Sequence, residues 1–188
     1  MLELAHTVIA ASHDDCQQRV SQEFAMNGSA TALDRAFAAL AYVMPLTSAL
    51  GAYGPFQSFL LEQAPAVANA FSLILLPLLP LIAIEQNQIL GLAVFIVLFA
   101  FVVRNTSISR FIRYNVLQAI LVSFVISVCI LLIGTLGVVL PSILLDTFLN
   151  VLFLGGMAIV IYGVAQSVMG RYADIPTVSD AINAQLPY

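Results

Sequence analysis

The sequence predicts an all-α integral membrane protein with four transmembrane helices, and three observations support this. Of the 188 residues, 61% are hydrophobic and only 9% are charged, too few polar side chains to cover a water-soluble globule. Long apolar runs recur along the chain. Three of the six cations, Arg104, Arg110 and Arg113, fall in one short break between two such runs. Because a charge at the bilayer centre costs about 2.5–3.5 kcal/mol, this break marks a membrane surface.

The charged residues narrow the possible partners of the protein. The formal net charge is −4 and all six cations are arginine, so no basic patch suggests nucleic acid as a partner. Membrane lipids are the expected surroundings of the apolar runs. We predict a polar N-terminal tail over 1–32, a helical membrane domain over 33–170 and a polar C-terminal tail over 171–188.

Five apolar runs are candidates for the four crossings. They cover 36–53, 66–84, 89–103, 116–140 and 143–168. A helix needs about 20 residues to span the hydrocarbon, so the last two runs are comfortable and the third is short. The second is long enough but contains Pro77 and Pro80, each of which removes a backbone donor. It is the weakest candidate for a straight span.

The arginines favour four crossings over five. Five would place Arg104, Arg110 and Arg113 opposite Arg19 and Arg35, against the positive-inside rule. If 66–84 is instead re-entrant or interfacial, all the arginines share one side, and both termini are cytoplasmic or stromal. Glu62, Glu85 and Asp146 then fall on the other side. Backbone that breaks at membrane depth must be covered by protein, so residues 76–81 are expected to pack on the bundle.

The N-terminal tail shows no secretory signal, since it is acidic and lacks an apolar run behind a basic start. This is expected of a bacterial protein, an organelle-encoded one, or a mature form without its presequence. His6, His13, Asp14, Asp15 and Cys16 offer metal-ligating types, but a solvated tail is the favoured interpretation. We expect no metal and no cofactor.

The arginine break resembles an interfacial elbow. Arg104, Arg110 and Arg113 are predicted membrane-surface anchors, with Ser107 capping a short helix whose apolar residues face lipid. Asn115 and Gln118 follow three residues apart, so they share a helix face. An inter-helix hydrogen bond is the favoured role of these amides, and contact with a polar substrate is the alternative.

The remaining polar and small residues of the membrane domain have mainly structural interpretations. Asn150, one turn after Asp146, is predicted to serve packing or substrate contact. Glu85, followed by three amide side chains, is expected in a solvated turn. Small residues recur at helical spacing and predict two packing seams, because they let helices approach closely in lipid. The seam residues are Ser123, Ser127 and Gly134 on the fourth run and Gly156, Gly163 and Ser167 on the fifth.

The side-chain inventory favours a noncatalytic protein. Both histidines are in the N-terminal tail, lysine is absent, and Gly-rich phosphate loops, paired cysteines and His-Glu-x-x-His are missing. We therefore expect no enzyme activity.

Several stretches nevertheless carry a family resemblance. The most specific are Val-Val-Arg-Asn, Ile-Ser-Arg-Phe and Arg-Tyr-Asn-Val-Leu-Gln-Ala, in that order within 102–119. Apolar pieces at 39–46 and 76–81 and weaker matches at 176–181 and 185–186 extend it over about 33–186. These stretches resemble the Tic-twenty family, the twenty-kilodalton subunit of the protein import translocon of the chloroplast inner envelope, with cyanobacterial and plastid-encoded relatives.

The resemblance implies a four-helix protein of the plastid inner envelope or a cyanobacterial membrane. Its implied role is the core or channel-forming part of a preprotein translocon, acting with other copies or other subunits. The outer acidic residues would attract basic presequences. A noncatalytic scaffold or assembly factor is the main alternative, and a small-solute carrier is a weaker one.

Overall fold

The computed structural model describes residues 30–173, 175 and 182, and every regular element in that part of the chain is a helix. The predicted all-α class is confirmed. The elements are α2 (Ala32–Ala41), α3 (Val43–Leu50), α4 (Gly54–Gln63), α5 (Pro65–Leu75), η1 (Leu76–Leu78), α6 (Leu79–Gln86), α7 (Gln88–Val97), η2 (Leu98–Val103), α8 (Arg110–Leu136) and α9 (Ser142–Val168).

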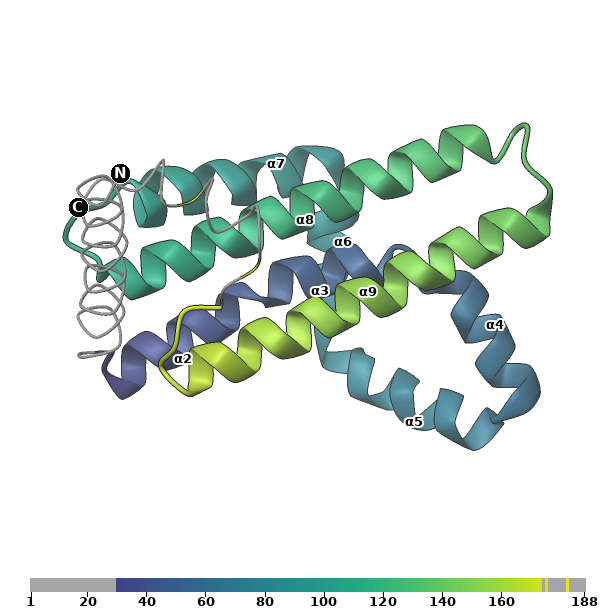
Figure 1. Ribbon diagram of the computed structural model, residues 1–188, viewed down its shortest axis with the longest axis horizontal. Helices are drawn as coiled ribbons and strands as arrows, with labels where there is room; N and C mark the ends of the chain where they lie inside the picture. The colour runs from purple at the N-terminus through teal and green to yellow at the C-terminus, as the bar shows by residue number, and fades with distance from the viewer. Residues whose placement is uncertain (1–29, 174, 176–181, 183–188) are drawn as a thin grey trace, which may run out of the picture.

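Two long helices form the backbone of the molecule. α8 and α9 each have 27 residues, so each is about 40 Å long at 1.5 Å per residue, enough to cross a bilayer. They run antiparallel and are joined by a short connection ahead of Pro141 (Figure 1). Both runs were predicted as crossings, and the structure confirms that both helices are long and apolar enough.

α2 and α3 pack against this pair to complete a core of four helices (Figure 1). Together they extend over Ala32–Leu50, and α4 then turns away by 78°. Tyr42, Ala49 and Ala38 lie buried where α2 and α3 meet α8 and α9. The first apolar run, 36–53, therefore lies almost entirely in α2 and α3 of the core, and the bent helix α4 follows it.

The proline-rich region differs from the prediction. Pro65–Gln86 is 22 residues long and apolar enough to span, whereas Ile89–Val103, predicted to cross, is a shorter helix. Length therefore ranks these two runs in the opposite order. Within the longer one, Pro77 lies in η1, a tight turn between α5 and α6, as expected where a proline removes a helix hydrogen bond.

This region is also barely covered by protein. Only 6% of the most apolar window of Pro65–Gln86 is buried. α6 does pack on α3, but Leu76 and Leu79 are 54% and 52% exposed. The prediction that 76–81 packs on the bundle is thus wrong for the turn itself, because the chain can present apolar side chains to lipid there.

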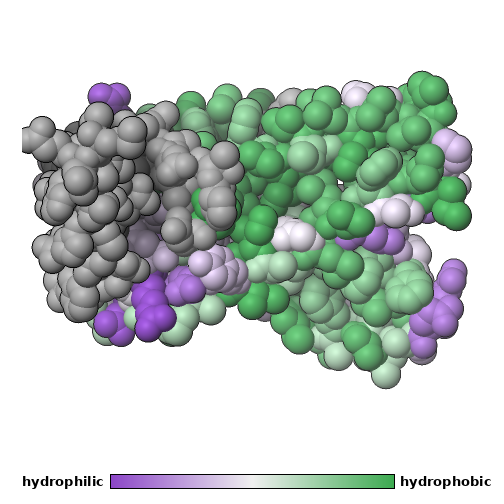
Figure 2. Space-filling model, viewed as in Figure 1, coloured by the Kyte–Doolittle hydropathy of each residue, from purple (hydrophilic) through white to green (hydrophobic). Residues whose placement is uncertain are grey.

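The starts of α2 and α8 and the ends of η2 and α9 meet at one end of the molecule (Figure 1). Thr31 and Asp34 form a reciprocal capping box, and the Ser109 hydroxyl donates to Asp34 Oδ1 at 3.2 Å, linking the starts of α2 and α8. This arginine end carries Arg35, Arg104, Arg110, Arg113 and Arg171. Figure 2 shows apolar surface over the middle of the molecule and hydrophilic residues mainly toward its ends.

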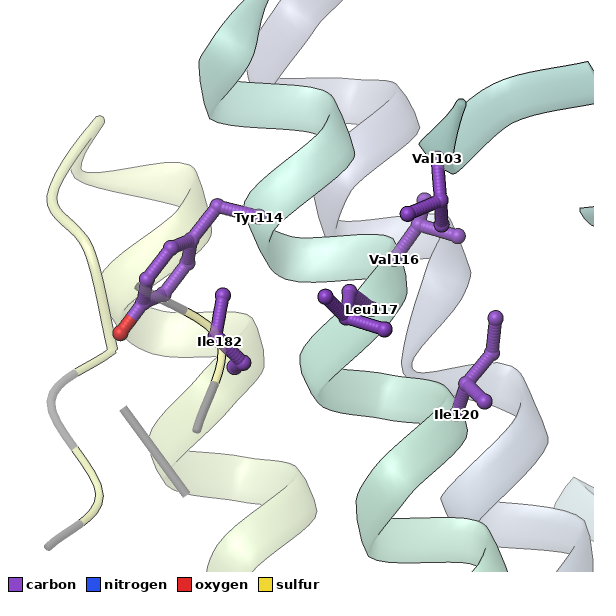
Figure 3. Close-up of a cluster of buried hydrophobic side chains, with 6 residues drawn as sticks. All are labelled: Val103, Tyr114, Val116, Leu117, Ile120 and Ile182. Carbon is purple, nitrogen blue, oxygen red and sulfur yellow. The ribbon is translucent and has the colours of Figure 1, made fainter. Parts of the chain in front are cut away.

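The arginine end holds a small apolar cluster. Val103, Tyr114, Val116, Leu117 and Ile120 pack together, and Ile182 near the C-terminus joins them from far along the sequence (Figure 3). Most of the predicted tails, with Arg19 and the possible metal ligands of the N-terminal one, lie outside the described residues.

Candidate functional site

A groove of about 560 Å³ opens between α3, α6, α7 and α8, and we call it the lateral groove. Its volume is within the usual range for ligand pockets. Most of its lining is aliphatic or aromatic, with a few polar side chains. The lining residues are Val43, Met44, Thr47, Leu81, Ile84, Glu85, Gly91, Leu92, Val94, Phe95, Ile120, Ser123, Phe124 and Ser127.

Glu85 is the acidic residue of the lateral groove. It lies near the end of α6, is partly buried, and its Oε1 accepts a hydrogen bond from the Ser48 hydroxyl of α3 at 2.6 Å. The expectation of a solvated turn is wrong, because α6 packs on α3 and brings these two residues together. Among the described residues, no salt bridge neutralises this carboxylate.

The opposite wall supplies serine hydroxyls from α8. Ser123 is only 5% exposed, and among the described residues its Oγ has no hydrogen-bond partner. Ser127, one turn further, is exposed and also lines the groove. Thr47 differs, because its hydroxyl donates to the carbonyls of Val43 and Met44. The groove thus contains an acceptor on α6 and an unpaired hydroxyl on α8.

A tight turn between α6 and α7 shapes this site. Asn87 caps α7, its side-chain oxygen accepting from the amides of Ile89 and Leu90 at 3.1 Å each. A Cβ on Gly91 would lie 2.8 Å from the Glu85 carbonyl oxygen, so glycine permits the close approach of the two helices. The turn fixes where Glu85 enters the groove.

A second polar group lies inside the four-helix core. Asn115 is fully buried, and its Oδ1 accepts from Tyr42 at 3.4 Å and from Ser167 at 3.0 Å. The contact links α2, α8 and α9 and agrees with the favoured packing role of Asn115. Gln118 is equally buried, and its amide has no partner among the described residues. Neither amide lines the lateral groove.

The arginine break differs from the predicted elbow. Ser109, rather than Ser107, caps α8, and Phe111 is buried instead of facing lipid. Arg113 is only 8% exposed, and its Nε donates to the Val103 carbonyl at 2.8 Å. This arginine therefore holds the end of η2 and does not reach for headgroups. Arg104 is exposed, and an anchoring role for it and for Arg110 stays a prediction.

An aromatic cluster closes the arginine end beside these cations. The Tyr172 ring makes edge contacts with Phe111 and Tyr114, at centroid distances of 5.3 and 4.8 Å. Burial raises the pKa of the Tyr172 hydroxyl, an effect that Arg110 partly opposes. The phenol is therefore neutral at physiological pH.

The glycines of the two predicted packing seams differ in how closely other helices approach them. A Cβ on Gly163 would overlap the Tyr42 ring, and one on Gly156 would lie 2.9 Å from the Ala49 side chain. The fifth-run seam thus packs α9 on α2 and α3. Gly134 has open space around it, so its predicted packing role is wrong. Asn150 is partly buried, and its Oδ1 lacks a partner among the described residues.

No group of three or more His, Cys, Asp or Glu side chains in the described part of the chain has the geometry to hold a metal.

The sequence did not predict that Glu85 and Ser123 line one groove. One signal was available for Glu85, because an ionisable residue next to a membrane-depth segment is a functional candidate by default. Nothing in the sequence pairs it with Ser48, 37 positions away.

The fold and the site together define a class: a polytopic helical membrane protein whose apolar side groove contains a carboxylate. The family described as "Chloroplast import apparatus Tic20-like" matches residues 7–182. The chain belongs to this family.

Individual relatives agree with the family match. A Tic20 family protein of Synechocystis is 41% identical over 169 residues, which cover 87% of this chain and 99% of the relative. The Tic20 family protein Ycf60 of Pyropia yezoensis is 30% identical, over 77% of this chain and 71% of the relative. The chloroplastic protein TIC 20-II of Arabidopsis thaliana is 28% identical, over 82% and 73%. The resemblance seen in the sequence is confirmed.

Proposed function

We propose that the chain is a noncatalytic membrane subunit of a preprotein translocation complex, in which the lateral groove borders the path of the passing polypeptide. The observation that carries this proposal is the family match over 7–182, since that family is described as a chloroplast import apparatus. Its membrane is a cyanobacterial membrane or the plastid inner envelope. The groove adds a surface that suits the apolar side chains of a passing segment.

The proposal assigns the path to the side of the bundle. The four-helix core is filled by side chains, with Tyr42 against Gly163 and Ala49 against Gly156. An extended polypeptide passing through it would have to separate packed helices. A path along the lateral groove leaves the core intact and needs only a second wall, from another copy or a partner subunit.

The proposal also includes four crossings with both termini on one side. The starts of α2 and α8 are hydrogen-bonded to each other, so the chain between them leaves the arginine end and returns. We assign the outward crossing to α2–α4 and the return to α5–η2, each broken at mid-course. In a background with Cys16 and Cys129 replaced by serine, Ala30→Cys, Ser107→Cys and Arg171→Cys should label from the same side, and Glu62→Cys from the other. Opposite labelling at 30 and 107 would mean an odd number of crossings between these two positions and would restore five crossings in total.

The translocation role is tested by crosslinking to an arrested precursor. A photoreactive phenylalanine analogue replaces Phe95 or Phe124 in the groove, and, as matched controls, Phe101 or Phe148, which are exposed elsewhere. We expect adducts with the precursor from the two groove positions and few from the controls. Adducts with lipid or resident membrane proteins alone at all four positions would contradict translocation and favour the scaffold role.

A further inference from the structure

The lateral groove has the features of a recognition site, and its polar atoms define what it would recognise. We propose that it binds a polypeptide segment in which an arginine or lysine is flanked by apolar residues, with Glu85 receiving the cation. The inference rests on the proposed function and names the substrate chemistry of the same site.

The Glu85 carboxylate has one hydrogen-bond partner and can accept more. Glu85 Oε1 accepts from Ser48, and Glu85 has no further hydrogen bond and no ion pair with any described residue. A carboxylate oxygen has room for two acceptor contacts, so the group retains capacity for an incoming donor. Ser48 is itself buried, which fixes the carboxylate in the groove wall instead of leaving it free to turn outward.

Ser123 is a second polar residue of the lateral groove, and it comes from α8. Ser123 lies on the opposite wall and is only 5% exposed. Its hydroxyl has no hydrogen-bond partner in the described part of the chain. A buried hydroxyl is normally paired, and an orphan one that lines a groove indicates a missing partner. A guanidinium or ammonium has several donors, so it can serve both Glu85 and the oxygen of Ser123.

The rest of the groove lining is mostly apolar. Leu81, Ile84, Leu92 and Phe95 on one side and Ile120 and Phe124 on the other are apolar. This lining matches the side chains that neighbour a cation on an amphipathic segment. A charge in apolar surroundings is stabilised only when it is paired, so the site discriminates between a basic side chain and an acidic one.

The depth of Glu85 in the membrane favours a polypeptide over a lipid headgroup as the occupant of the groove. α7 and η2 together contain 16 residues, so about 24 Å of helix separates Glu85 from the arginine end, and α6 is followed at once by the turn into α7. α8 continues beyond the groove residue Ser127 for nine more residues, to Leu136. The carboxylate therefore lies about 24 Å from the arginine end, where the side chain of a passing segment can reach it and a headgroup amine at that end cannot.

The test uses the full-length chain in lipid nanodiscs and labelled peptides. The probe is an Ala/Leu-rich helical peptide with one central arginine, compared by fluorescence anisotropy with the same peptide carrying glutamine. We expect the arginine peptide to bind roughly tenfold more tightly, as for a hydrogen bond to a charged group. Glu85→Gln, which preserves shape and the Ser48 contact, should abolish the preference, and the exposed Glu62→Gln should preserve it.

The outcomes separate this inference from the proposed function. Retention of the arginine preference in Glu85→Gln, or its absence in the wild-type chain, overturns the charge recognition even if the groove crosslinks to a precursor. A preference lost only in Glu85→Gln, without any precursor adduct, leaves the binding site standing and refutes translocation. Thermal unfolding of each variant checks folding, and Ser123→Ala should lower affinity for the arginine peptide about tenfold through loss of one hydrogen bond from a charged donor.

Discussion

Two regions of the molecule are built from similar apolar helices but contact different surroundings. In the core of α2, α3, α8 and α9, glycines let helices approach closely, and Asn115 links three of them. In the region from α4 to α7, Leu76 and Leu79 face outward and the helices break repeatedly. The core covers its apolar side chains with protein, whereas the other region exposes many of its apolar side chains to lipid and borders the lateral groove. Stability therefore comes mainly from the first region, and we place recognition in the lateral groove, where α6 and α7 of the second region meet α3 and α8 of the first.

The two regions are still joined by a defined contact. Tyr53 stacks at tilted angles on Phe71 of α5 and on Phe153 of α9, with ring centroids 5.2 and 5.1 Å apart. This contact holds the α4–α5 pair near the core.

The largest effect is expected in the core at Gly163. In Gly163→Ala the new methyl would overlap the Tyr42 ring, and we expect a loss of about 3 kcal/mol in the free energy of unfolding. Gly155→Ala, on the same helix with open space around it, is the matched control and should be neutral or slightly stabilising. Unfolding in mixed detergent micelles measures both. Equal effects would show that α9 does not pack on α2 as described.

A smaller loss is expected at the arginine end. Arg113→Gln removes the donor to the Val103 carbonyl, and should cost about 2 kcal/mol because that carbonyl is left buried without a partner. Arg104→Gln, an exposed counterpart, should change stability by less than about 0.5 kcal/mol. Both are measured by the same unfolding assay. If the two variants behaved alike, Arg113 would be the surface anchor that the sequence predicted.

These residues show what the sequence could and could not give. The runs 116–140 and 143–168 predicted α8 and α9 closely, because a long apolar run can satisfy its backbone in lipid only as a helix. The sequence could not separate Gly163 from Gly134, since each is a small residue at helical spacing and only the neighbouring helix decides which is buried. The cap that the sequence predicted at Ser107 is instead Ser109, whose hydroxyl oxygen accepts from the amide of Ile112.

The groove was less predictable than the fold. Glu85 and Ser48 meet through the packing of α6 on α3, which depends on a turn at Asn87 and on the absence of a side chain at Gly91. Neither signal identifies a partner 37 residues earlier in the sequence. Family resemblance indicated the class of protein, whereas the groove depends on how α3, α6, α7 and α8 pack together.

The next effect concerns the inter-helix hydrogen bonds of the core. Asn115→Leu removes the acceptor shared by Tyr42 and Ser167 and should cost about 1 kcal/mol, since such bonds in membranes average near 0.6 kcal/mol each. Asn150→Leu is the comparison, because the Oδ1 of Asn150 has no partner among the described residues. It should be neutral or stabilising in the same assay. A larger loss at Asn150 would mean that its oxygen is paired in the membrane.

An equally small effect is expected where proline interrupts a helix. Pro45 in α3 is fully buried, and Pro77 in η1 is exposed, so one substitution can be made in both regions. Pro45→Ala removes packed atoms from the core and should cost about 1 kcal/mol. Pro77→Ala removes exposed atoms and restores a backbone donor in the turn, so it should change stability by less than about 0.5 kcal/mol. The unfolding assay compares them directly, and a loss at Pro77 that equalled the loss at Pro45 would show that the α5–α6 turn is packed against protein after all.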